Sequence, residues 1–242
     1  MQAGARNRIA GISRAFATGA VACALGMTAC ATTQKVAVQQ AGLSCGLLGS
    51  DCSRLTPGSE DQLALRWVNP NATWSQYNAV LIQPVTFWGA EASSVSPSDQ
   101  QMLCGFLYQA LVTQIGSTKL KVVQESGPGV MQLQAAIMDA STSTPGLRTI
   151  SMVVPQARAL NTLKYLATGT YAFVGGAQAE GRVMDSVTGQ VLAEAVDRRV
   201  GGGSATAAAS FQWGDAENVL TKEAEITAQR LAEWTSPGGA PR

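Results

Sequence analysis

The 242-residue sequence contains no histidine. Histidine is the usual general base of Ser-His and Cys-His nucleophile pairs, and its imidazole is the commonest metal ligand. Its absence excludes these pairs and every metal site built on imidazole. We expect no metal and no other cofactor.

Charged residues are also few, and the two signs are nearly balanced. Charged residues make up 14% of the chain, and the formal net charge is +1. Nucleic-acid binding requires a strongly basic face, so no nucleic-acid partner is expected. No apolar run beyond the N-terminal region approaches the roughly 20 residues that span a bilayer.

Residues 1–29 have the pattern of a signal peptide. Three arginines and no acidic residue come first, followed by a mostly apolar stretch at 15–29. A charged segment before an apolar segment of this length is typical of secretory signals. We expect cleavage after residue 29, which leaves a chain with 14 basic and 16 acidic residues and a formal charge of −2.

Cys30 is the predicted lipidation site. The letters "MTAC" at 27–30 resemble the bacterial lipobox, in which the thiol receives a diacylglycerol and the peptide is cut before the cysteine. Acyl chains anchor a protein with about 0.8 kcal/mol per buried CH₂. Cys23 lies inside the apolar stretch and would be removed. An ordinary cleaved signal peptide is the alternative.

Residue 31 is Ala, so the Asp that retains lipoproteins in the inner membrane of enteric bacteria is absent. We therefore expect a lipid-anchored protein of the outer membrane that faces the periplasm, with the bilayer as one partner through acylated Cys30. The expected organisation is a lipidated tether at 30–44, one periplasmic domain at 45–234 and a disordered tail at 235–242.

Cys45 and Cys52 enclose a short loop with two glycines. An oxidising periplasm permits a disulfide between them, and two reduced cysteines are the alternative.

The periodicity of apolar residues predicts the order β–α–β–β–α–β–β–α. Ser96 is the expected cap of the first helix, with Asp99 at the capping-box position. Hairpins imply antiparallel pairs, and the first strand–helix–strand unit is compatible with a parallel pair. The fold class is therefore α+β, a mixed and largely antiparallel sheet with helices packed on it. The elements are expected at 77–88 (strand), 96–116 (helix), 120–140 (two strands around "SGPG"), 155–169 (helix), 177–200 (hairpin) and 215–234 (helix).

Several long stretches resemble one known family. They are "SCGLLGSDCSRLTPG", "RWVNPNATWSQYNAVLIQPVTFW", "SGPGVMQLQAAIMDA", the block from "VVPQARALNTLKYL" to "AEAVDRR", and "WGDAEN". Together, over about 44–234, they are similar to bacterial lipoprotein family 3313 of the domains of unknown function. The resemblance implies an envelope lipoprotein and supplies no activity or catalytic residues. Relatives often have tyrosine where this chain has Cys52, so the cysteine pair is a feature of this chain.

The hairpin at 177–200 carries a group of charged residues on its two arms. We expect a solvated surface cluster in which arginines pair with carboxylates across the strands. Alternatively, two of its carboxylates could perform acid–base chemistry, as in glycoside hydrolysis. The cluster comprises Glu180, Arg182, Asp185, Glu194, Asp197, Arg198 and Arg199.

These observations favour a non-enzymatic binding or assembly role in the cell envelope, with an envelope protein as the expected partner. One alternative is a carboxylate-dependent hydrolase of envelope glycan, which needs two carboxyls roughly 5–10 Å apart in a cleft. Another is a periplasmic carrier of a small apolar ligand, which needs a cavity between helices and sheet. Trp67, Trp74 and Trp88 are interpreted as core residues rather than a contact platform.

Overall fold

The computed structural model describes residues 33–40, 43, 45–89, 95–142, 175–201, 213–239 and 241. The predicted signal peptide, Cys30 and the helix predicted at 155–169 lie outside these residues.

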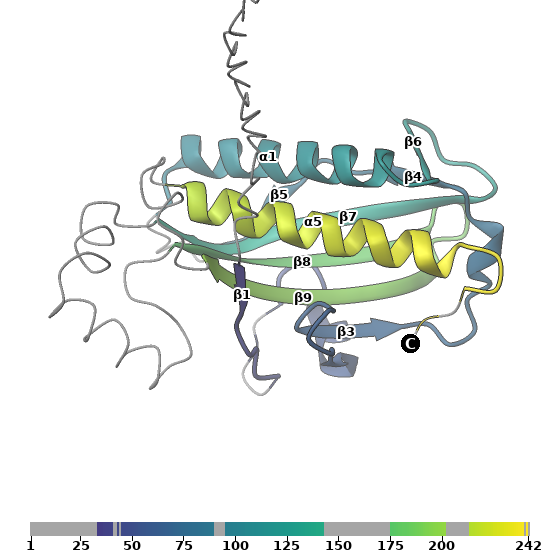
Figure 1. Ribbon diagram of the computed structural model, residues 1–242, viewed down its shortest axis with the longest axis horizontal. Helices are drawn as coiled ribbons and strands as arrows, with labels where there is room; N and C mark the ends of the chain where they lie inside the picture. The colour runs from purple at the N-terminus through teal and green to yellow at the C-terminus, as the bar shows by residue number, and fades with distance from the viewer. Residues whose placement is uncertain are drawn as a thin grey trace, which may run out of the picture. The chain divides into compact units, whose positions relative to one another are not determined.

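The described residues form one nine-stranded mixed sheet with two long α-helices, which confirms the α+β class (Figure 1). The strand order is β2-β3-β9-β8-β7-β4-β6, while β1 pairs with β9 and β5 with β7. The elements are β1 (Thr33–Lys35), η1 (Gly49–Arg54), β2 (Thr56–Pro57), β3 (Leu65–Val68), η2 (Trp74–Gln76), β4 (Ala79–Ile82), β5 (Thr86–Phe87), α1 (Pro97–Gly116), β6 (Lys121–Val123), β7 (Val130–Ser141), β8 (Gly176–Asp185), β9 (Val191–Gly201) and α5 (Gly214–Trp234).

The strand β4 is central to the parallel part of the sheet. All four of its residues are buried, as its continuous apolar run predicts. It pairs in parallel with β6 on one side and with β7 on the other. The two strands around "SGPG" therefore both form, yet they do not pair with each other, because the more apolar β4 lies between them. The buried strand expected within 77–88, with the proline at its end, forms as β4, and the short strand β5 follows Pro84.

Helix α1 begins where its capping signals predict. The Ser96 hydroxyl accepts a hydrogen bond from the Asp99 amide at 3.2 Å, and Leu103, Leu107 and Ile115 are buried along one face. Helix α5 lies beside α1 on the same face of the sheet and runs along β8 and β9 (Figure 1). Trp74 is buried against Trp234 near the end of α5, with ring centroids 4.8 Å apart.

The opposite face of the sheet is covered by the segment around η1. A small apolar cluster there includes Leu48, Leu55 and Val196. Cys45 and Cys52 are paired as a disulfide in this segment, with Cα atoms 6.2 Å apart, a separation typical of disulfides.

Three expectations about the ends of the domain and its tryptophans need correction. Within the segment predicted as a tether, β1 adds to the sheet beside β9, because β3 covers only the earlier part of that strand. Within the predicted disordered tail, residues 235–239 form hydrogen-bonded turns that end α5. Trp74 is a core residue as predicted, but Trp88 is 51% exposed, and Trp67 is half-buried beneath the guanidinium of Arg54.

Candidate functional site

A cavity of about 100 Å³ lies between α5 and the helix-covered face of the sheet. Its walls are mainly aliphatic and come from α1, β7, β8, β9 and α5. This is the kind of space that the carrier hypothesis requires. The apolar lining includes Leu107, Leu111, Leu133, Val183, Ala193 and Leu231.

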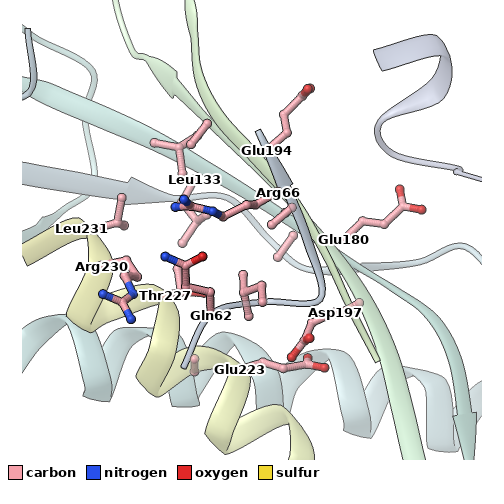
Figure 2. Close-up of a pocket in the computed structure, with 18 of the residues that line it drawn as sticks. Gln62, Arg66, Leu133, Glu180, Glu194, Asp197, Glu223, Thr227, Arg230 and Leu231 are labelled. Carbon is pink, nitrogen blue, oxygen red and sulfur yellow. The ribbon is translucent and has the colours of Figure 1, made fainter. Parts of the chain in front are cut away.

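Glu223 of α5 is among the residues that line the cavity. Its side chain is buried, with a residue exposure of 5%. Neither carboxylate oxygen has a hydrogen-bond partner among the residues that the structure describes. Figure 2 shows this carboxyl group beside that of Asp197 on β9. Burial, reinforced by the negative charge of Asp197, raises the pKa of Glu223 well above its ordinary value, against the opposing effect of Arg199.

Asp197, by contrast, has its hydrogen bonds satisfied. Its Oδ1 accepts from the Ala64 amide at 2.8 Å, and its Oδ2 accepts from Nε of Arg199 at 2.6 Å. Burial raises the pKa of Asp197, and the Arg199 guanidinium acts in the opposite direction. Asp197 and Arg199 therefore form a buried ion pair, and Glu223 is the additional acid beside it.

Arg66 of β3 and Arg230 of α5 line the cavity away from these acids, and Figure 2 shows both apart from Asp197. Arg230 is paired with Asp61 and, at 2.7 Å, with Glu233. The cavity thus has mainly aliphatic walls, with Asp197 and Glu223 among its lining residues in one part and the two arginines in another.

The predicted surface cluster is not observed: several of its members are buried, and they lie on two different faces of the sheet. Glu180, Asp197 and Arg199 are only 1%, 2% and 5% exposed, so they do not lie on a solvated face. Successive side chains of a strand point to opposite faces, and this alternation divides the cluster. Asp197 and Arg199 face α5, whereas Glu180 and Arg182 face the segment around η1, and Figure 2 shows Glu180 and Glu194 pointing away from the cavity.

The charges on the η1 side form a hydrogen-bonded network. Glu194 accepts from Nε and Nη2 of Arg54 at 2.8 and 2.6 Å, and from Nε of Arg182 at 2.7 Å. Nη2 of Arg182 in turn bonds Asp51 at 3.1 Å and the Leu48 carbonyl at 3.2 Å.

Glu180 completes this side. It accepts from the Leu48 amide at 3.1 Å, and burial raises its pKa against the lowering effect of the nearby backbone amides. The network fastens the η1 segment to the sheet, and we assign it a structural role.

Arg198 and Asp185, the two remaining members of the predicted cluster, belong neither to the ion pair beneath α5 nor to the network on the η1 side. Arg198 is exposed. Asp185 ends β8 and caps the hairpin turn, accepting from the Thr188 amide at 2.7 Å and from the Tyr77 hydroxyl at 3.0 Å. The amide of Thr188 is the main reason why the pKa of Asp185 is lowered.

A hydrolytic pair is not assembled from the predicted carboxylates. Asp197 lies opposite Ala179, six positions before Asp185 on β8, and six residues of strand span roughly 20 Å. Glu180 and Glu194 lie on the other face, where Glu194 is held by arginines. The acids that do meet are Asp197 and Glu223.

Sequence reasoning misses Glu223, although the sequence contains a signal for it. The apolar stripe of α5 includes Leu220 and Ala224, and Glu223 follows Leu220 by three positions, which places it on the same face. A carboxyl group inside an otherwise apolar helix stripe marks a buried acid.

The described residues contain no group of three or more His, Cys, Asp or Glu that could hold a metal ion. Among the described helices, none combines the length and apolar character needed to cross a membrane.

Comparison with known families decides the relationship of this chain. The family model DUF3313, a protein family of unknown function, matches residues 46–226. The chain belongs to the DUF3313 family. No curated protein matches this DUF3313 chain by sequence.

Solved structures similar to this DUF3313 protein share little sequence with it. A PelC dodecamer from Paraburkholderia phytofirmans is 9% identical, with 66% of this chain and 95% of that chain covered and a TM-score of 0.38. A Xanthomonas campestris protein of family model DUF330 is 14% identical, with 67% and 88% covered and a TM-score of 0.38. At these scores the similarity supports no inference about activity.

Proposed function

We propose that this DUF3313 protein is a lipoprotein of the outer membrane, anchored through acylated Cys30, whose periplasm-facing domain has a non-enzymatic binding or assembly role. The observation that carries the anchor is the "MTAC" sequence at the end of an apolar stretch of signal-peptide length. The proposed partners are the bilayer and an envelope protein.

The use of the carboxylates supports a binding role over a catalytic one. Glu194 is held by two arginines, Asp197 by Arg199 and a backbone amide, and Asp185 by a turn. A catalytic acid or base must exchange its proton with a substrate within hydrogen-bond reach. These three carboxylates are engaged in holding the fold together, so the proposal assigns none of them to a reaction.

A second function is favoured by the cavity. Its mainly aliphatic walls between α5 and the sheet fit the carrier of a small ligand with an apolar body. This role is compatible with anchoring, because a tethered domain can deliver or sense a ligand at the membrane surface.

Acyl labelling with membrane fractionation tests the anchor. The native chain is expected to incorporate a labelled fatty acid and to sediment with outer membranes, whereas Cys30→Ala loses both properties. The matched control is Cys23→Ala, which removes a thiol from the same region and should behave like the native chain. A native chain that is unlabelled and free in the periplasm would overturn the anchor.

A further inference from the structure

We propose that the indole ring of Trp88 is a second membrane contact of this protein and enters the interfacial region of the bilayer that holds Cys30. The partner of this surface is phospholipid, and the surface lies near the β1 end of the sheet. This inference deepens the anchor proposed above and rests on it, because acyl chains at Cys30 keep this end of the domain close to a bilayer.

Trp88, the residue that follows β5, is 51% exposed. Phe87, the residue before it, packs against the core beneath the helices. Successive side chains of an extended chain point to opposite faces, so Trp88 lies on the face of the sheet that carries the η1 segment. A large aromatic side chain at this degree of exposure is surface that a partner can cover.

The ring is held in this exposed position by contacts within the protein. Its Nε1 donates a hydrogen bond to the Thr86 hydroxyl at 2.8 Å. Part of the ring lies against Gly46, where a Cβ atom would come within 2.7 Å of it. Nε1 is the only polar atom of an indole and is a donor only. Because that donor is already satisfied, the exposed part of the ring can leave water without losing a hydrogen bond.

The strand register places this ring near one end of the sheet. The Trp88 amide donates to the Ile137 carbonyl at 2.8 Å. Ile137 lies opposite Ala179 on β8, which in turn lies opposite Asp197 on β9. Trp88 is thus level with the residue after Asp197, about three strand residues or roughly 10 Å from Gly201, the last residue of β9. The turn between β8 and β9 is about twice as far away.

The predicted anchor lies at the same end. Thr33 pairs with Gly201, and four strand spacings of about 4.8 Å separate β1 from β5 across β9, β8 and β7. Trp88 is therefore roughly 20 Å from Thr33. Cys30 precedes Thr33 by three residues and reaches at most roughly 11 Å beyond it. The ring and the acyl chains are close enough for one bilayer surface to meet both.

The chemistry of this surface fits phospholipid. Tryptophan is enriched where membrane meets water, with its ring at the level of the headgroups. Among the described residues, the exposed charges level with Trp88 are Arg198 on β9 and Asp139 on β7, both opposite Gln178 of β8. One charge of each sign leaves this row of the sheet without net charge, so burial of the indole decides the contact rather than attraction to anionic lipid.

The test is quenching of tryptophan fluorescence by brominated phospholipid. The acylated protein, purified from membranes, is reconstituted into phosphatidylcholine vesicles whose acyl chains do or do not carry bromine. The chain has five tryptophans, of which Trp74, Trp213 and Trp234 are buried and Trp67 is half-buried beneath Arg54. Brominated lipid should therefore remove about one-fifth of the wild-type emission, the share of a single tryptophan at the interface.

Trp88→Phe should lose this quenching, because it removes the indole from the surface and leaves an aromatic ring in its place. Trp234→Phe is the matched control, since it makes the same change at a buried position at the end of α5. It should keep the quenched emission of wild type. The measurement on wild type needs no substitution, so it holds even if a variant folds poorly.

Flotation of the vesicles separates failure of this contact from failure of the anchor. An acylated protein that floats with the vesicles but is not quenched, or whose quenching persists in Trp88→Phe, would overturn the Trp88 contact and leave the anchor standing. The exposed ring would then be left to a protein partner. A protein that carries no acyl chain and does not float would overturn both.

Discussion

At the scale of single residues, the burial of Glu223 makes the stability of the folded protein depend on pH. Its folded-state pKa is raised, mainly by burial, while the unfolded chain has the ordinary glutamate value. Between these two values the folded protein keeps a proton that the unfolded protein releases. Stability from this group therefore declines as pH rises above the unfolded pKa, and the decline ends only above the folded pKa.

We predict that Glu223→Gln makes the protein more stable than wild type at pH 8 and equally stable near pH 4. Glutamine keeps the size of the side chain and removes the group that must lose a proton. Thermal unfolding followed by circular dichroism between pH 4 and 8 should show the difference in Tm grow to a few degrees. Glu180, whose pKa is also raised, lies on the other face of the sheet, titrates in both proteins and does not contribute to this difference. Parallel curves for the two proteins would contradict the prediction.

Residue-scale reasoning from the sequence was right about which side chains are charged neighbours and wrong about what surrounds them. The alternation of the hairpin predicts that Asp197 and Arg199 share a face, and they do. It does not reveal that a helix more than ten residues later in the chain covers that face. The solvent exposure of a strand's side chains depends on which other elements pack on that strand, so the alternation of residues within the strand cannot predict it.

At the scale of elements, the η1 segment is held to the sheet by a buried carboxylate. The side chain of Glu194 is fully buried and contacts Arg54 and Arg182, which are 34% and 18% exposed. Removing one partner of a fully buried ion pair costs about 3–5 kcal/mol, and without Glu194 the two arginines would keep only Asp51 as a carboxylate partner among the described residues.

We predict that Glu194→Ala lowers the free energy of unfolding by on the order of 3 kcal/mol, the lower end of that range because both arginines reach solvent. Urea denaturation provides the measurement. Arg198→Ala, an exposed position on the same strand, should change stability by less than about 0.5 kcal/mol. Similar midpoints for the two variants would show that the network contributes little.

The elements differ in how far local sequence defines them. Both long helices and the β8–β9 hairpin follow from caps, stripes and alternation within single stretches. The pairings of β1 and β3 with β9 join residues more than 120 positions apart, and three or four residues of strand contain too little pattern to specify a partner. The order of strands in the sheet could therefore not be predicted from the sequence, although the α+β class could.

At the scale of the whole molecule, the early start of β1 constrains how an anchored domain meets the membrane. If Cys30 carries the lipid, three Cα–Cα steps of at most about 3.8 Å separate it from Thr33, a reach of roughly 11 Å. Thr33 lies opposite Gly201 at the end of β9. The end of the sheet formed by β1 and the last residues of β9 is thus expected at the bilayer surface.

The turn between β8 and β9 lies at the other end of the hairpin. Val187 in this turn is exposed, and the ten strand residues from Val191 to Val200 extend over roughly 30 Å. We predict that a fluorophore on Thr33→Cys is quenched by brominated lipids in reconstituted vesicles, whereas one on Val187→Cys is not.

The same two labels on a Cys30→Ala background should both be unquenched, because no lipid then holds the domain. Equal quenching at the two positions of the anchored protein would mean that the domain lies along the bilayer. Quenching at Val187→Cys alone would mean that it is inverted. The expected pattern would place the start of α5, where Asp215 lies beside Gly201, near the bilayer, and the turn between β8 and β9 away from it by about the length of β9.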